Sequence, residues 1–77
     1  MQLAVVIPAL NCERTIATVV TGARAHLETI VVVNDGSSDA TAAAARAAGA
    51  EVIEHHRCRG KGAALLSAME VLERRGI

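Results

Sequence analysis

The chain has 77 residues, contains no Phe, Tyr or Trp, and has a hydrophobic content of 52%. Eight basic residues balance eight acidic ones, so the formal net charge is zero. This balance excludes the broad basic surface of a nucleic-acid-binding protein, and without aromatic rings there are no platforms on which bases stack. The apolar content excludes a disordered chain, although so small a domain buries a limited share of its surface.

Three short apolar runs predict three β-strands, at Leu3–Ile7, Thr29–Val33 and, more weakly, Glu51–His55. Runs that are apolar on both faces are typical of a parallel sheet covered by helices. Pro8 is expected to end the first strand, because it has no N–H to donate to a sheet. No apolar run approaches the length of a membrane span, and the first run lacks the basic leader of a signal peptide.

Three helices are expected to alternate with these strands. The first has an apolar stripe at helical spacing, formed by Ile16, Val19, Val20, Ala23 and Leu27. Alanine dominates residues 40–48 and predicts the second helix, with Ser38 or Asp39 as its cap and Gly49 as its stop. The third is expected from about residue 62 to 75, with a buried stripe of Leu65, Ala68, Met69 and Leu72.

The resulting order, β-α-β-α-β-α, predicts a single structural unit over residues 1–77, expected to be an incomplete, N-terminal part of a domain. It is an α/β fold with three layers, α/β/α, around a parallel sheet, and it is Rossmann-like. Right-handed crossovers bring all three strand-to-helix loops to the carboxyl edge of the sheet, where ligands bind in such folds. The functional residues are therefore sought in these loops.

The second loop carries two acids, Asp35 directly after the strand and Asp39 at the start of the helix. Both can be local, because Asp35-Gly36 favours a turn and Asp39 favours a helix N-terminus. The alternative is that these carboxylates accept hydrogen bonds from a nucleobase N–H and from ribose hydroxyls. The apolar strand before Asp35 favours the second interpretation for that residue, whereas Asp39 fits both equally.

The first and third loops are polar too. Asn11 and Glu13 follow the first strand, and each has a local alternative, an Asx turn and a first-turn helix acid. Arg57, Arg59 and Lys61 surround two glycines before the last helix, a setting that suits a phosphate but lacks the spacing of a P-loop. A solvated basic loop is the alternative there.

Metal and disulfide chemistry have little support in the sequence. His55 and His56 are adjacent and would point to opposite faces of a strand, and with Cys58 they fall short of the four convergent ligands of structural zinc. Cys12 and Cys58 are expected to be reduced thiols of a cytosolic protein.

Three blocks, "VVIPALNCERTI", "ETIVVVNDGSSDAT" and "RGKGAALLSAM", together resemble the opening of family 2 glycosyltransferases, which have the GT-A fold. The order and spacing of the blocks match across nearly the whole chain. The Gly-Lys-Gly loop is most similar to the polyprenyl-phosphate hexosyltransferase branch, such as the dolichyl-phosphate mannose and glucose synthases. Leu10 departs from the Tyr found in many relatives, and Cys12 from a small or polar residue.

This resemblance implies a nucleotide-binding set in which each residue has a part. Asp35 would bind the base, Asp39 would lie near the base or ribose, and Lys61 near the diphosphate or the donor pocket. The nucleoside pocket would also be lined by Pro8, Ala9, Asn11 and Glu13. A divalent cation, Mg²⁺ or Mn²⁺, is expected for the complete enzyme, with an Asp-x-Asp motif beyond residue 77. Neither metal ligands nor catalytic residues are therefore expected in this chain.

The function implied is that of an N-terminal, nucleotide-sugar-binding part of an inverting, metal-dependent hexosyltransferase, with a polyprenyl phosphate among its candidate acceptors. The chain alone is expected to be inactive, to contact the remainder of the catalytic domain or a second copy of itself, and to bind no nucleic acid. A cytoplasmic location is expected, with membrane contact only through further segments or a lipid acceptor. The alternative is a small non-catalytic nucleotide-binding or interaction module. An Asp-x-Asp soon after residue 77 would distinguish the two.

Overall fold

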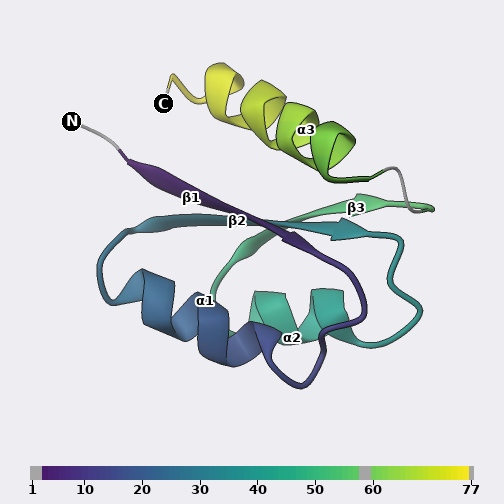
Figure 1. The fold of residues 1–77 in the computed structure, drawn as a ribbon. Helices are drawn as coiled ribbons and strands as arrows, with labels where there is room; N and C mark the ends of the chain where they lie inside the picture. Colours follow the sequence, from purple (N-terminus) through teal and green to yellow (C-terminus); the bar gives the residue numbers. More distant parts are fainter. Residues whose placement is uncertain (1–2, 58–59, 77) are drawn as a thin grey trace.

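The computed structural model describes residues 3–57 and 60–76, except for the side chain of Lys61. Strands and helices alternate along the chain as expected (Figure 1). The strands are β1 (Ala4–Ala9), β2 (Thr29–Asp35) and β3 (Glu51–His55). The helices are α1 (Ile16–Arg24), α2 (Thr41–Ala47) and α3 (Gly60–Arg74). The α/β prediction with a parallel sheet is therefore confirmed.

The sheet has the order β1-β2-β3, and both pairs are parallel. The central strand β2 is the most buried, and Val31, Val32 and Val33 have no exposed surface. The prediction that Pro8 ends the first strand is wrong, since β1 continues through Pro8 to Ala9. A proline fits there because β1 is an edge strand, and an edge strand leaves some of its N–H groups without a partner in the sheet.

Helices cover both faces of the sheet, with α3 on one side and α1 and α2 on the other (Figure 1). Side chains of β2 alternate between the two layers, as the pleat of a strand requires. Ile30 and Val32 pack with Ile16 and Val20 of α1. Val31 and Val33 pack with the two buried alanines of α3, Ala64 and Ala68. Alternate residues of β2 thus pack against opposite helix layers.

The predicted buried stripe of α3 is wrong in part. Ala68 is fully buried, but Leu65 and Met69 are 46% and 56% exposed. The helix is rotated so that alanines face the sheet, because small side chains let a helix approach a sheet closely. Val19, expected in the stripe of α1, is likewise 48% exposed. The two helices therefore present large apolar side chains to solvent.

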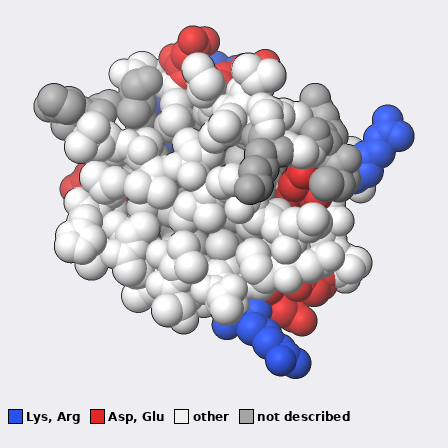
Figure 2. Space-filling view, viewed as in Figure 1, with Lys and Arg blue, Asp and Glu red and all other residues white. Residues whose placement is uncertain are grey.

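The surface around the β1 edge carries few charges. Figure 1 looks toward this edge, with β1 in front of β2, and Figure 2 shows the same face as mostly uncharged with charged side chains around its rim. Among the described residues, no helix combines the length and apolarity needed to cross a membrane.

Candidate functional site

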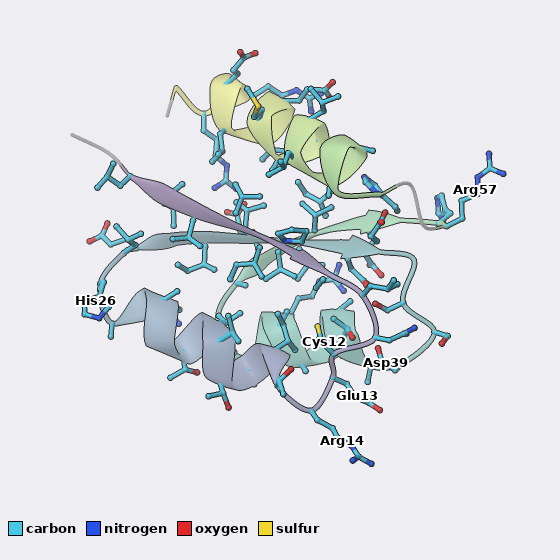
Figure 3. All side chains as sticks on the ribbon, viewed as in Figure 1. Cys12, Glu13, Arg14, His26, Asp39 and Arg57 are labelled. Atoms are coloured by element: carbon cyan, nitrogen blue, oxygen red, sulfur yellow. The ribbon has the colours of Figure 1, made fainter. Side chains whose placement is uncertain are left out.

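The loops after β1 and β2 meet at the carboxyl edge of the sheet and enclose an open hollow of about 290 Å³. Its lining consists of Asn11, Cys12, Glu13, Arg14, Thr15 and Asp39. In Figure 3, Glu13 and Asp39 lie close together beside Cys12, while Arg14 points outward. His26 lies at the opposite end of the molecule. The expectation that the first two loops come together is thus met.

Asn11 joins the two loops from an unusual backbone conformation. Its φ is +48°, in the left-handed region that asparagine tolerates better than most residues. Its N–H donates to Ser37 Oγ at 2.9 Å, and its Oδ1 accepts from the Ser38 N–H at 2.9 Å. The first loop therefore turns at Asn11 and is fixed there by the Ser-Ser pair of the second loop.

The carboxylates of Glu13 and Asp39 each accept a hydrogen bond from a backbone N–H of the other loop. The Glu13 N–H donates to Asp39 Oδ2 at 3.2 Å, and the Ala40 N–H donates to Glu13 Oε2 at 3.1 Å. Each carboxylate thus accepts a hydrogen bond from the backbone at the start of the helix that follows the other loop. The N–H groups there have no carbonyl partner within the helix. In the ligand-free chain both acids have a structural role, and a ligand would have to add to these bonds or displace them.

Thr41 also links the two loops, through its hydroxyl group. It is fully buried, its Oγ1 accepts from the Cys12 N–H at 2.9 Å, and its hydroxyl donates to Asp39 Oδ1. The Thr41 N–H donates to the same oxygen at 3.0 Å, so Asp39 binds the first N–H of α2, although the N-cap position is occupied by Ala40 and not by the predicted Ser38 or Asp39. The Thr41 hydroxyl is the main cause that holds the pKa of Asp39 below its ordinary 3.8, aided by backbone N–H groups of Glu13 and Thr41.

Asp35 lies on the other face of the sheet, in the row of β2 that meets α3. Its Oδ1 is 2.8 Å from His55 Nδ1, and its Oδ2 accepts from the Gly60 N–H at 2.8 Å. The other ring nitrogen of His55 is 2.9 Å from Ser67 Oγ on α3. Asp35 and His55 are only 6% and 9% exposed. The aspartate thus occupies the N-terminal end of α3, where the sequence suggested a phosphate.

The remaining predicted residues are divided between the two faces. Ala9 is buried in the layer of α1 and α2, whereas Pro8 is exposed at the end of β1. Lys61 belongs to the first turn of α3, but its side chain lies outside the described residues. Asn11, Glu13 and Asp39 therefore share the hollow, and Asp35 is separate from them. Their roles in nucleotide binding stay predictions.

Sequence reasoning missed four residues that hold the loops: Ser37, Thr41, His55 and Ser67. One signal was available for His55, because alternation along β3 places it on the same face as Ile53, which packs toward α3. Cys12 is half-buried and forms no disulfide, while Cys58 lies outside the described residues. Within residues 3–57 and 60–76, no three His, Cys, Asp or Glu side chains could hold a metal ion.

Comparison with known families connects this geometry to a class of proteins. The family model "Glycosyl transferase family 2" matches residues 4–72. The chain belongs to glycosyl transferase family 2. A comparison with curated proteins found no match.

Solved structures similar to this family 2 chain include the glucosyl-3-phosphoglycerate synthase of M. tuberculosis. One structure of it is 32% identical with a TM-score of 0.74, and the match covers 87% of this chain and 29% of that one. Another, in complex with Mg²⁺ and UDP, is 33% identical with a TM-score of 0.71 and 83% and 27% coverage. A third holds Mn²⁺, UDP-glucose and phosphoglyceric acid, at 34% identity, a TM-score of 0.70 and the same coverage. This chain thus spans less than a third of the length of these proteins.

Proposed function

We propose that this chain is the nucleoside-binding part of a glycosyltransferase that uses a nucleotide-sugar donor. The observation that carries the proposal is the meeting of Asn11, Glu13 and Asp39 in one hollow at the carboxyl edge of a parallel sheet. Ligands bind at this edge in open α/β folds. The family match and the UDP named in two similar structures support the same class of donor.

Electrostatics favour the nucleoside end of the donor for the hollow. Glu13 and Asp39 are carboxylates, which accept hydrogen bonds from ribose hydroxyls and base N–H groups but repel a diphosphate. The diphosphate is therefore proposed to extend toward the start of α3, where Lys61 supplies a positive charge. Within the described part of the chain no group of three His, Cys, Asp or Glu side chains could hold a metal ion, and the proposal assigns no metal ligand to these residues.

The transferred group is proposed to be a hexose, with inversion, and two acceptors remain open. Resemblance of the Gly-Lys-Gly loop favours a polyprenyl phosphate, whereas the similar structures are of a glucosyl-3-phosphoglycerate synthase. Both acceptors carry a phosphate group. Nothing in the hollow distinguishes them, because it would receive the nucleoside and not the acceptor.

Titration of the ¹⁵N-labelled chain with UDP, followed by NMR, tests the proposal. Saturable shifts are expected at the amides of Asn11, Glu13 and Asp39, and none at His26 on the opposite end. Glu13→Gln should weaken binding, because it replaces a charged acceptor with a neutral one. Glu28→Gln removes the charge of another exposed acid, beyond α1, and should leave the affinity unchanged.

No saturable shift at ~10 mM UDP would mean a binding free energy weaker than about 3 kcal/mol, and would contradict nucleoside recognition by this chain. Saturable shifts confined to residues outside the hollow would contradict the assignment of the site.

A further inference from the structure

A chain of three side chains, two of them buried, links the end of β2 to α3 and lies outside the hollow. Asp35 Oδ1 contacts His55 Nδ1, and His55 Nε2 contacts Ser67 Oγ, at 2.8 and 2.9 Å. Because a carboxylate only accepts, Nδ1 carries the hydrogen of the first bond. The Ser67 hydroxyl completes the hydrogen bonding of the ring. Both ring nitrogens are therefore engaged, and the histidine is fixed in position and orientation.

The residue types are those of a hydrolytic triad, but the geometry assigns a different role. Ser67 lies in the interior of α3, where backbone N–H groups donate to carbonyls one turn earlier. Such N–H groups cannot form the oxyanion hole that acyl transfer needs. His55 is 9% exposed, which leaves little access for a substrate. The chain of contacts is suited to holding groups in place.

The group that it holds is the Asp35 carboxylate. With one oxygen fixed by His55, the other accepts from the Gly60 N–H at 2.8 Å. Gly60 begins α3 and has a φ of +88°, so a change in the direction of the carboxylate would alter the backbone at this turn. Asp35 thereby couples the end of β2 to the first turn of α3, which contains Lys61.

We propose that His55 and Ser67 are positioning residues: they fix the Asp35 carboxylate, which through the Gly60 N–H fixes the start of α3 for the diphosphate of a nucleotide. The nucleotide part of this inference rests on the proposed function. The Gly60 part does not, because it concerns the chain without a ligand. The two parts can therefore be tested separately.

The ligand-free test is amide hydrogen exchange at Gly60. His55→Ala should accelerate Gly60 exchange about tenfold or more relative to Val32, whose amide reports global stability. His55→Asn should restore part of the protection, since its amide can donate to Asp35. His56→Ala is the matched control, because this neighbour is exposed, and it should leave Gly60 unchanged. Equal exchange at Gly60 in wild type and His55→Ala would overturn the proposal.

The nucleotide test compares UDP with uridine, which has no phosphate groups. His55→Ala and Ser67→Ala should weaken UDP binding, by about tenfold for the histidine, and leave uridine binding unchanged, because the start of α3 lies at the proposed diphosphate end. Equal loss for both ligands, or loss for neither, would overturn the positioning of the start of α3 for a diphosphate. If wild type binds no UDP, the proposed function fails, while the exchange at Gly60 still decides the role of His55. If His55→Ala does not fold, His55→Asn and Ser67→Ala provide the same comparison.

Discussion

Thr41 is the residue whose replacement should separate the two loops most cleanly. Thr41→Val keeps the shape of the side chain but removes the hydroxyl, which accepts from the Cys12 N–H at 2.9 Å and donates to Asp39. Leaving a partly buried N–H without its partner costs about 1–3 kcal/mol. For a domain of this size, a loss of about 2 kcal/mol lowers Tm by roughly 8–16 °C.

Thermal melting followed by circular dichroism measures this loss, and Thr41→Ser is the control. Serine retains the hydroxyl and loses one methyl, so it should cost only about 0.8 kcal/mol. A second readout is the pKa of Asp39, which should return toward 3.8 in Thr41→Val because the Thr41 hydroxyl is the main cause of its depression. If Thr41→Val melts like Thr41→Ser and leaves the pKa of Asp39 unchanged, the hydroxyl does not hold the loops together.

The lowered pKa of Asp39 means that its carboxylate stabilises the fold above about pH 4 and loses this effect as the pH falls further, so Asp39→Asn should melt below wild type at pH 7 and approach it in acid. The chain alone should transfer no sugar from UDP-glucose, since the metal ligands are expected beyond residue 77, and turnover above a buffer control would refute this. Leu66 and Met69 are 63% and 56% exposed on α3, so the chain should self-associate in sedimentation velocity. Leu66→Glu should reduce that association more than Val19→Glu on α1, and equal effects would place the contact elsewhere.

The sequence predicted the order and type of all six elements because each has a strong local signal. Apolar runs mark β1 and β2, and alanine marks α2, so only the ends needed correction. The extension of β1 through Pro8 was missed because the rule against proline applies to central strands, and the strand order was not known.

The rotation of α3 could not be read from hydrophobicity. Ala64 and Ala68 lie four residues apart, and so do Leu65 and Met69, so two neighbouring stripes fit the helical period. Burial of larger side chains gains more free energy, and by this rule alone the stripe with Leu65 and Met69 would face the sheet. Instead, the alanines face the sheet, because they allow α3 to pack closely against the valines of β2. That contact joins segments that are distant in sequence.

The candidate site was predicted in its location but not in its bonding. Loop chemistry and parallel topology bring Asn11, Glu13 and Asp39 to one edge, as the sequence indicated. The partners of Asp35 were missed because His55 and Ser67 are far along the chain, and their contacts depend on how α3 is seated. Local turn rules describe Asp35 as a neighbour of Gly36, whereas the fold makes it a neighbour of Gly60.

Strand order has a consequence for how this chain folds during synthesis. Each pair of neighbours in the sheet is consecutive in the chain, with Ala4 opposite Thr29 and Val31 opposite Glu51. Pairing of β1 with β2 therefore requires nothing that is made later, and contacts of short sequence separation form fastest. Every described residue that lines the hollow lies between Asn11 and Asp39. The hollow can thus assemble on the nascent chain before β3 has emerged, and α3 then packs on the opposite face of the sheet.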